Sequence, residues 1–280
     1  MKKILITGAG SYIGGSFEEY MRKSSSEYAI DTLDMQNANW SEYDFSGYDA
    51  VFHVAGIAHR KETKENASLY YEVNRDLVVK TAKKAKEAGV PQFIFLSSMS
   101  VYGLERGVIT RDSATKPKSN YGRSKLEAEA ELEKLASDTF SLCTLRPPMV
   151  YGKGCRGNFG TVVALTKKLP LFPKVKNRRS MIYIDNLCEF VKIAIDRRLS
   201  GLFFPQNREY VCTTDMSQII AKKLGKKCRP SALLGFCARI AIPFVSKAEK
   251  AFGSLVYENT EILDFEYALI SSDEGISRSV

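Results

Sequence analysis

Thr7-Gly8-Ala9-Gly10-Ser11-Tyr12-Ile13-Gly14 joins an apolar run, Ile4–Thr7, to an amphipathic segment that begins near Ile13. The backbone N–H groups of such a glycine-rich turn, together with the dipole of the helix that it opens, can hold a pyrophosphate. The glycines at 8, 10 and 14 do not have the G-x-G-x-x-G spacing, so the position of the turn carries more weight than the pattern. A tight turn without a ligand is the alternative interpretation. The stretch predicts the start of a dinucleotide-binding fold.

Beyond this turn, short apolar runs continue to alternate with amphipathic stretches. The expected strands are Ile4–Thr7, Ala29–Leu33, Ala50–Val54, Phe93–Ser97 and Leu142–Arg146, and the expected helices begin near Ile13, span Leu69–Glu87 and follow Ser119. This alternation predicts an α/β fold with a doubly wound parallel sheet of the Rossmann type, covered on both faces. Gly89 and Pro91 predict the end of the 69–87 helix, since glycine suits a left-handed C-terminal residue and proline cannot continue a helix.

The alternation fades after Tyr151, where glycines between 152 and 160 indicate loops before a helix near Thr161–Lys168. A further strand and helix, Ser180–Ile184 and Asn186–Asp196, predict that the chain returns to the first domain. The expected division is a dinucleotide-binding Rossmann domain of residues 1–155 plus about 178–205, and a small substrate-binding lobe of about 156–177 plus 206–280.

Charge is distributed unevenly along the chain. The formal net charge is +9, and residues 1–150 hold 20 basic and 20 acidic side chains, against 21 and 12 in residues 151–280. The excess lies mainly between Lys153 and Arg229 and predicts that something anionic docks there. Because the sequence has neither a continuous basic stripe with interleaved aromatic residues nor a known nucleic-acid-reading motif, a small polyphosphate is favoured over nucleic acid. A solvated basic face is the alternative.

Thiols and imidazoles are few and scattered. The six cysteines form no C-x-x-C pair, and His53 and His59 are the only histidines. This pattern predicts reduced thiols, a cytoplasmic location and no metal site.

Neither of the two apolar segments that invite a membrane interpretation is expected to span a bilayer. The first, after Lys3, is too short for a signal peptide, and the second, Leu233–Val245, is interrupted by Arg239 and Pro243. We interpret the second segment as a cap over the substrate, with docking on a membrane surface as the alternative.

Asp34 follows the second expected strand, about 20 residues after the glycine-rich turn. A carboxylate there can accept hydrogen bonds from the hydroxyl groups of an adenosine ribose. It would repel an added 2′-phosphate, and the following Met35-Gln36-Asn37 has no arginine to receive one, so NAD is favoured over NADP. Asp31 is a competing candidate, and an ordinary exposed acid is the alternative interpretation.

Tyr121-Gly122-Arg123-Ser124-Lys125 places a phenol and an ammonium group four residues apart, on one face of an expected helix. Roughly one Tyr-x-x-x-Lys pair is expected by chance in this composition, so the spacing alone is weak. Its position gives it weight, because it follows a plausible helix start at Ser119 and lies one strand–helix unit after Ser97-Ser98.

Taken in order, these motifs resemble the extended short-chain dehydrogenase/reductases, and in particular the NAD-dependent epimerase/dehydratase group that acts on nucleotide sugars. The resemblance covers nearly the whole chain and weakens after about Gly225. The matching stretches are Thr7-Gly8 to Gly14, Asp34, Asp44-Phe45, Val51-Phe52-His53-Val54-Ala55-Gly56, Asn74, Phe93 to Gly103 with Ser98-Met99-Ser100, Tyr121 to Lys125, and Leu145-Arg146-Pro147-Pro148-Met149-Val150-Tyr151-Gly152.

The resemblance implies three catalytic residues and the cofactor NAD. Tyr121 is implied to be the general base, Lys125 to lower the pKa of Tyr121 and hold the nicotinamide ribose, and Ser98 to hydrogen-bond the reacting oxygen. A phenol with a pKa of about 10 is a poor base at neutral pH, but a nearby ammonium group and a positive nicotinamide ring favour phenolate. Proton transfer from a sugar hydroxyl to Tyr121 would then accompany hydride transfer to NAD.

The resemblance also implies further contacts to cofactor and substrate. Those to the cofactor are Gly8, Gly10, Ser11, Tyr12, Ile13, Gly14, Asp34, Asn74, Val54, Ala55 and Gly56, with Asp44 and Phe45 beside the adenine and Pro147 near the nicotinamide. Those to the substrate are Ser98, Met99, Ser100, Asn158 and Arg179. Arg179 matches the position that clamps a diphosphate, for which a guanidinium group is well shaped, and loop capping is the alternative role for Asn158.

Three departures from the family pattern bear on the reaction. The middle glycine of the turn is replaced by Ser11, with Gly10 one place earlier, and an asparagine common in the last motif is replaced by Met149. The 4,6-dehydratases of the family follow the active-site Ser or Thr with Asp-Glu, whereas this chain has Met99-Ser100, so dehydration is not expected.

Two reactions on a UDP- or dTDP-sugar remain. We expect C4 epimerisation of a UDP-hexose, of the UDP-glucose 4-epimerase type, because the expected NAD preference and the motif set favour it. Net reduction of a 4-keto deoxysugar by NADH or NADPH is the alternative, favoured by Met149 and the short second lobe. A non-catalytic dinucleotide-binding regulator is a third alternative. A homodimer through the helices at 69–87 and 119–135 is implied by the family, with apolar support from Leu69, Val73, Leu77 and Val78.

Overall fold

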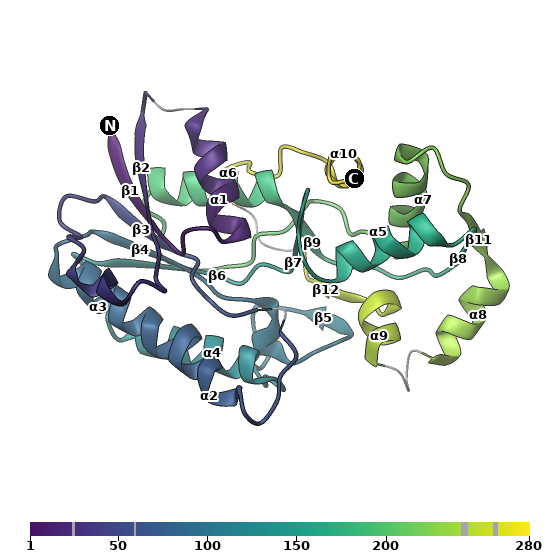
Figure 1. Ribbon diagram of the computed structural model, residues 1–280, viewed down its shortest axis with the longest axis horizontal. Helices are drawn as coiled ribbons and strands as arrows, with labels where there is room; N and C mark the ends of the chain where they lie inside the picture. Colours follow the sequence, from purple (N-terminus) through teal and green to yellow (C-terminus); the bar gives the residue numbers. More distant parts are fainter. Residues whose placement is uncertain (24–25, 59, 242–245, 260–262) are drawn as a thin grey trace. The chain divides into compact units, whose positions relative to one another are not determined.

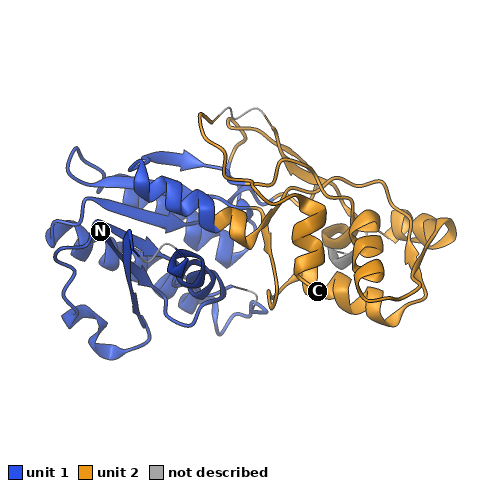
Figure 2. Ribbon diagram, turned by 90° about the horizontal axis from the view of Figure 1, so that it is seen from above, with its two compact units in different colours: residues 1–103, 115–147, 188–205 blue, residues 104–114, 148–187, 206–280 orange. Residues whose placement is uncertain are grey.

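The computed structural model describes residues 1–23, 26–58, 60–241, 246–259 and 263–280, so His59 and residues 242–245 of the apolar segment 233–245 lie outside the described residues. The chain forms two compact units (Figure 2). Unit 1 comprises 1–103, 115–147 and 188–205, and unit 2 comprises 104–114, 148–187 and 206–280. This division differs from the expected one at 104–114, 148–155 and 178–187, all of which belong to unit 2.

Unit 1 contains a six-stranded parallel sheet (Figure 1). Its strands are β1 (Lys2–Thr7), β2 (Tyr28–Leu33), β3 (Ala50–His53), β4 (Gln92–Leu96), β6 (Ser141–Leu145) and β10 (Gly201–Phe203). The spatial order is β10-β6-β4-β3-β1-β2, and every neighbouring pair is parallel. The predicted doubly wound α/β fold is therefore confirmed, and the five strands expected before residue 150 end within one residue of their predicted positions. The sequence patterns did not reveal β10.

Helices cover both faces of this sheet, as Figure 1 shows, with α1 and α6 on one side and α2, α3 and α4 on the other. Their bounds are α1 (Tyr12–Arg22), α2 (Ala67–Tyr71), α3 (Leu77–Glu87), α4 (Asn120–Glu133) and α6 (Ile184–Asp196). The single helix expected over 69–87 is interrupted by a π-helical turn, η2 (Glu72–Asp76). Gly89 follows α3 with φ of 77°, the left-handed conformation that its sequence position predicts.

The core of unit 1 lies between the sheet and helices α3 and α4. It includes Val51, Phe93, Phe95 and Phe140, each at most 1% exposed. Val78 is also fully buried there. Its side chain therefore stabilises the fold and is not available to support a dimer interface.

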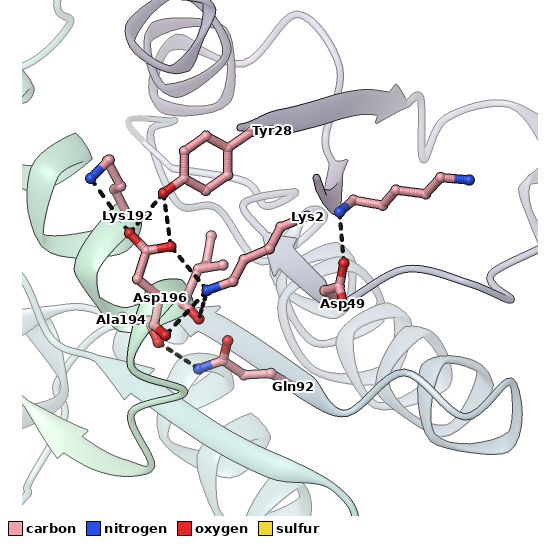
Figure 3. A network of polar contacts seen from close by, with 9 residues as sticks. Lys2, Tyr28, Asp49, Gln92, Lys192, Ala194 and Asp196 are labelled. Carbon is pink, nitrogen blue, oxygen red and sulfur yellow. Dashed lines mark hydrogen bonds and ion pairs between the residues drawn. The ribbon is translucent and has the colours of Figure 1, made fainter. Parts of the chain in front are cut away.

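A polar network ties α6 to the amino-terminal edge of the sheet (Figure 3). The Asp196 carboxylate accepts hydrogen bonds from the hydroxyl of Tyr28 at 2.7 Å and from the ammonium group of Lys2 at 3.0 Å, and Lys192 lies 3.4 Å away. Gln92 donates to the carbonyl oxygen of Ala194 at 2.9 Å. Because these residues begin β1, β2 and β4, the network holds the end of the sheet opposite to the glycine-rich turn.

Unit 2 is built from short strand pairs and helices. The strands are β5 (Gly107–Ile109), β7 (Met149–Tyr151), β8 (Leu171–Pro173), β9 (Met181–Tyr183), β11 (Arg229–Ser231) and β12 (Leu255–Tyr257), and the helices are α5 (Asn158–Lys168), α7 (Thr213–Lys223), α8 (Ala232–Ala241), α9 (Ser246–Phe252) and α10 (Ser272–Arg278). β9 pairs with β7 in unit 2, whereas residues 188–205, with most of α6 and all of β10, belong to unit 1, so the chain returns to the first domain as expected but begins to do so only after Ser180–Ile184. Within the described ranges, no helix is long and apolar enough to cross a membrane.

Candidate active site

The glycine-rich turn is closed by Ser11, the residue that departs from the family pattern. Its hydroxyl accepts a hydrogen bond from the N–H of Gly14 at 3.2 Å and caps α1, which Tyr12 and Ile13 begin. Gly8 and Gly10 have φ of 120° and 73°, values that favour glycine. Serine at position 11 thus contributes a helix cap, while Gly10 supplies the left-handed residue.

The turn packs directly against the end of β3. A Cβ atom on Gly8 would lie 2.7 Å from the nitrogen of Ala55, and one on Gly14 would lie 3.0 Å from a methyl group of Val54. The nitrogens of Val54 and Ala55 both donate to the carbonyl oxygen of Thr7. Backbone without side chains therefore lines the turn, which suits close approach by a dinucleotide diphosphate.

Asp34 and Asp31 have different surroundings. Asp34 is exposed just beyond β2, and the nitrogens of Gly8 and Ala9 donate to the carbonyl oxygen of the preceding Leu33. Asp31 lies within β2, and its carboxylate accepts a hydrogen bond from Tyr48 at 2.7 Å. Asp34 also accepts a hydrogen bond, from the nitrogen of Gln36 at 2.9 Å, so the geometry favours it as the ribose-binding residue only because it borders the turn.

The side chains of Asp44 and Phe45 are occupied by local contacts. Asp44 accepts hydrogen bonds from the nitrogen and hydroxyl of Ser46 at 2.8 and 2.7 Å, which lower its pKa. The ring of Phe45 is 1% exposed in the core, with the Lys84 ammonium group 5.2 Å from its centre. An adenine beside this segment would therefore meet backbone more than the Phe45 ring.

Asn74 fixes the loop after β3. This fully buried side chain lies in η2, accepts a hydrogen bond from the nitrogen of Ile57 at 2.8 Å and donates to its carbonyl oxygen at 3.1 Å. A Cβ atom on Gly56 would lie 3.0 Å from the Asn74 oxygen and 3.4 Å from the Lys125 nitrogen. The loop thus passes directly over the two side chains implied to hold the cofactor.

Lys125 is buried at the carboxyl end of β4. Its ammonium group donates to the carbonyl oxygen of Leu96 at 2.8 Å and lies 4.7 Å from the ring centre of Phe95. Burial lowers the pKa of Lys125 to about 8, and the negative charge of Glu129 raises it in part. The side chain is held in one place before any ligand binds.

The hydroxyl of Ser98 lies close enough to the phenol of Tyr121 to affect its pKa. Ser98 also caps the 3₁₀ turn η3 (Met99–Tyr102) by accepting from the nitrogen of Ser100 at 3.1 Å. Burial raises the pKa of Tyr121, and the Ser98 hydroxyl lowers it in part. The net direction in this structure is opposite to the expected lowering by Lys125, because loss of hydration is the largest cause.

Two backbone contacts bring the neighbouring segments to this pair. The nitrogen of Met99 donates to the carbonyl oxygen of Pro147 at 3.0 Å. A Cβ atom on Gly122 would lie 2.6 Å from the carbonyl oxygen of Ser100, so α4 can approach η3 only because residue 122 is glycine. Ser98, Met99, Ser100, Tyr121, Lys125 and Pro147 are therefore brought together.

Sequence reasoning missed a buried acid that supports these segments. Glu129, one turn after Lys125, receives hydrogen bonds from Ser97 and from Arg146, whose Nη2 lies 2.5 Å from a carboxylate oxygen. Arg146 also donates to the hydroxyl of Tyr102 at 2.8 Å. The Lys-x-x-x-Glu spacing was a usable signal for Glu129, but its partners are separated from it by 17 or more residues.

Glu62 is a second residue that the sequence did not reveal. Its two carboxylate oxygens accept hydrogen bonds from the nitrogens of Asn120 and Tyr121 at 2.9 and 3.0 Å. An acid at a helix N-terminus satisfies free N–H groups and complements the helix dipole. Glu62 thereby fastens the loop after β3 to the start of α4.

Arg179 and Asn158 belong to unit 2. The Nη1 atom of Arg179 donates to the carbonyl oxygen of Gly253 at 3.0 Å, while its buried Nε atom has no hydrogen-bond partner. Burial lowers the pKa of Arg179, and Glu105 raises it in part. Asn158 is exposed in the first turn of α5, where Gly157 is the capping position and no side chain caps the helix. The loop-capping alternative for Asn158 therefore finds no support.

The cysteines and histidines form no second site in the described part of the chain. All six cysteines are free thiols. His53 in β3 shares a hydrogen bond of 2.7 Å with Thr7, and burial lowers its pKa to about 3, so it is neutral. Among the described residues, no cluster of His, Cys, Asp and Glu side chains could hold a metal ion.

Known proteins similar to this chain have both candidate activities. The family model described as "NAD dependent epimerase/dehydratase family" matches residues 4–203. The chain is 31% identical to a UDP-glucose 4-epimerase of Vibrio cholerae, over 80% of this chain and 76% of that protein. It is 26% identical to an N-acetyl-alpha-D-glucosaminyl-diphospho-ditrans,octacis-undecaprenol 4-epimerase of Escherichia coli O157:H7, over 78% of this chain and 70% of that protein. It is 23% identical to a dTDP-4-dehydro-6-deoxyglucose reductase of Escherichia coli, over 93% of this chain and 94% of that protein.

Solved structures share the fold over the whole chain. A UDP-glucuronic acid 4-epimerase from Bacillus cereus in complex with NAD has a TM-score of 0.75 at 19% identity and covers 99% of this chain and 95% of its own. A dTDP-4-dehydrorhamnose reductase from Bacillus anthracis in complex with NADP has the same TM-score and identity, with 100% and 98% covered. Structural relatives in this fold thus hold NAD or NADP.

Proposed function

Because the chain belongs to the NAD-dependent epimerase/dehydratase family of nucleotide-sugar enzymes, we propose that it epimerises a UDP-hexose at C4 through a 4-keto sugar. The observation that carries this proposal is that the Ser98 hydroxyl acts on the phenol of Tyr121, while the ammonium group of Lys125, one helical turn further along α4, is fixed at the end of β4. The three groups stand where the carboxyl ends of β1, β3, β4 and β6 meet, which is the usual ligand edge of such sheets.

Each of these side chains has a distinct task in the proposed reaction. Tyr121 takes the proton of the C4 hydroxyl as the hydride leaves C4, and Ser98 donates a hydrogen bond to the oxygen that becomes the ketone. When bound, NAD would supply the acceptor and the donor of this hydride. Tyr121 then gives the proton back to the same oxygen, while the sugar presents its opposite face. A raised pKa makes the Tyr121 phenolate a stronger base for the first step, and it makes the phenol a weaker acid for the return step.

Lys125 has an electrostatic task. Its positive charge near the cofactor site favours the phenolate form of Tyr121 when the substrate binds. The same ammonium group, held by Leu96, suits hydrogen bonding to a ribose hydroxyl. Asp34 and the turn at 8–14 are proposed to bind the adenosine and diphosphate of the cofactor.

The residues after Ser98 argue against elimination of water. Met99 and Ser100 provide no carboxyl group, and two acids on neighbouring segments are engaged, Glu129 by Arg146 and Ser97 and Glu62 by the start of α4. The proposed chemistry is therefore confined to one carbon of the sugar. In unit 2, Arg179 with its unpaired Nε is proposed to bind the substrate diphosphate, and Asn158 is a second proposed substrate contact.

Net reduction of a 4-keto deoxysugar is the second candidate. It is favoured by length, because the chain aligns with 94% of the Escherichia coli reductase and with 76% of the Vibrio cholerae epimerase. The higher sequence identity to the Vibrio cholerae epimerase, 31% against 23%, keeps epimerisation as the first proposal. A non-catalytic regulator is disfavoured, since Ser98, Tyr121 and Lys125 are all present.

The stoichiometry of the cofactor distinguishes the two reactions. The purified chain is incubated with UDP-glucose, UDP-galactose, their N-acetylated forms and a dTDP-4-keto-6-deoxyhexose, while product stereochemistry and cofactor absorbance are followed together. We expect interconversion at C4 without net use of NADH, and a loss of roughly 100-fold or more in the Tyr121→Phe variant. Consumption of one NADH per product would establish reduction instead. Full turnover by Tyr121→Phe would refute the assigned base.

Two properties of the assembly complete the proposal. The free thiols support a cytoplasmic protein. We also propose a homodimer through α2, η2, α3 and α4, supported by the partly exposed apolar side chains of Leu69, Val73 and Leu77. Sedimentation velocity of the full chain would test it, and a monomer at all concentrations would contradict it.

A further inference from the structure

Helix α8 presents an apolar face to solvent. Leu233, Phe236 and Ile240 are 73%, 60% and 54% exposed, and their spacing of three and four residues places them on one side of the helix. We call these three residues the α8 face. Single exposed apolar side chains are common on protein surfaces. Three large ones aligned on a ten-residue helix indicate a surface that binds another molecule or a membrane.

The opposite side of α8 fixes the helix in this orientation. Gly235 and Ala238 are buried, and a Cβ atom on Gly235 would lie 2.2 Å from the carbonyl oxygen of Lys174, just after β8. The nitrogen of Lys174 in turn donates to the carbonyl oxygen of Ser231, which immediately precedes α8. Because the backbone contact at Gly235 leaves no room for a larger side chain, α8 cannot turn its apolar face inward.

Basic side chains border this helix. β8 and β11, which α8 adjoins, are parallel partners with Leu171 opposite Arg229, and both of these side chains are exposed. Exposed lysines flank the pair at 167–168 and 226–227, where Lys226 donates to the carbonyl oxygen of Lys167 at 2.8 Å. The sequence has no acidic residue over 157–184 or 216–241. The surroundings of the α8 face therefore carry positive charge that no acid on these segments offsets.

We propose that the α8 face and the bordering lysines dock on the surface of a bilayer that contains anionic phospholipid. Apolar side chains on one helix face can enter the boundary between headgroups and acyl chains, while lysine and arginine remain among the anionic headgroups. A second copy of this chain fits the surface less well, because pairing two such faces would bring their lysines together. The inference does not depend on which sugar reaction the enzyme performs.

The test uses the full chain and sedimentation with phosphatidylcholine vesicles, with or without phosphatidylglycerol. Wild type is expected to bind the anionic vesicles and not the neutral ones, and added salt should weaken binding. The double variant Leu233→Ser, Phe236→Ser should bind at least tenfold more weakly, and so should Lys226→Gln, Lys227→Gln. A matched control is Val108→Ser, Leu269→Ser, which replaces equally exposed apolar residues elsewhere in unit 2 (56% and 55%) and should bind as wild type does.

Three results would overturn the proposal. The first is a failure of wild type to sediment with anionic vesicles, or sedimentation of an α8-face variant with these vesicles to the same extent as wild type. The second is an α8-face variant that dissociates a wild-type oligomer without lipid, because the occupant would then be a second copy. The third is loss of sugar-nucleotide turnover in that variant without vesicles, which would assign the segment to a cap over the substrate. Circular dichroism of each variant checks that it is folded.

Discussion

The carboxylate of Glu129 and the guanidinium group of Arg146 form an ion pair in which each side chain is 10% exposed, and this pair connects the segments that carry the candidate catalytic groups. Glu129 stands on α4 after Tyr121 and Lys125, and Arg146 directly precedes Pro147. Ser97, the residue before Ser98, also donates a hydrogen bond to Glu129 and so links the end of β4 to this ion pair. One buried charge pair thus fixes the ends of β4 and β6 against α4.

Replacing Glu129 with glutamine should destabilise the protein strongly. Removing one partner of a buried ion pair leaves the other charge uncompensated, which costs about 3–5 kcal/mol in the free energy of unfolding. Glu131→Gln is the matched control, because Glu131 pairs with Lys134 on the exposed side of the same helix, where the loss should be much smaller. Chemical denaturation measures both variants, and equal stabilities would contradict the role assigned to Glu129.

The burial of Lys125 predicts a pH-dependent stability. Its pKa in the folded protein is about 8, below its usual value, so between pH 8 and about 10.5 the unfolded chain binds the proton that the folded chain has lost. Unfolding free energy should therefore rise with pH across this interval, by up to about 3 kcal/mol relative to a Lys125→Met variant. Denaturation of both proteins at several pH values measures the difference. A difference that stays constant with pH would show that the lysine titrates normally.

Much of the fold was predictable because buried parallel strands read as short apolar runs. β1, β3 and β4 are such runs, and glycine and proline marked the end of α3. Three-residue strands such as β7, β9 and β10 have no detectable period, so their pairing could not be predicted. This is why the return to the first domain was expected at Ser180–Ile184, whereas unit 1 resumes only at residue 188, and why the expected domain limits differ from those of the two units.

The candidate site was predictable for a related reason. The carboxyl ends of parallel strands meet at one edge, so motifs that follow β1, β3, β4 and β6 had to lie close together. The roles of Glu62 and Glu129 were not predicted, because each contacts backbone or side chains that are distant in sequence. The direction in which the pKa of Tyr121 shifts was not predicted either. Residue spacing indicates a nearby ammonium group, but it does not indicate the loss of hydration around the phenol.

The close contact of Gly122 with η3 predicts a specific loss of activity. In Gly122→Ala the new methyl group would meet the carbonyl oxygen of Ser100 at 2.6 Å, so α4 and η3 must separate and move Tyr121 away from Ser98. We expect kcat to fall by more than tenfold. Gly15→Ala in α1 is the comparison, because a Cβ atom there meets nothing within 4 Å and should stabilise the helix by about 0.5–1 kcal/mol. Turnover of Gly122→Ala at the wild-type rate would show that the contact relaxes without moving the pair.

The position of Asp34 predicts the choice between NAD and NADP. A carboxylate at about 4 Å repels a 2′-phosphate by about 1 kcal/mol in water and about 4 kcal/mol near a protein surface, so wild type should bind NAD at least tenfold more tightly than NADP. Asp34→Ala should bring the two dissociation constants together, chiefly by improving NADP binding. Asp31→Ala is the control. It removes the β2 carboxylate that accepts a hydrogen bond from Tyr48, so it should lower stability without changing the ratio of the NAD and NADP dissociation constants. Titration calorimetry measures the dissociation constants of NAD and NADP for wild type and for each variant. If Asp31→Ala changes the ratio of the two constants and Asp34→Ala does not, Asp31 is the residue that binds the ribose.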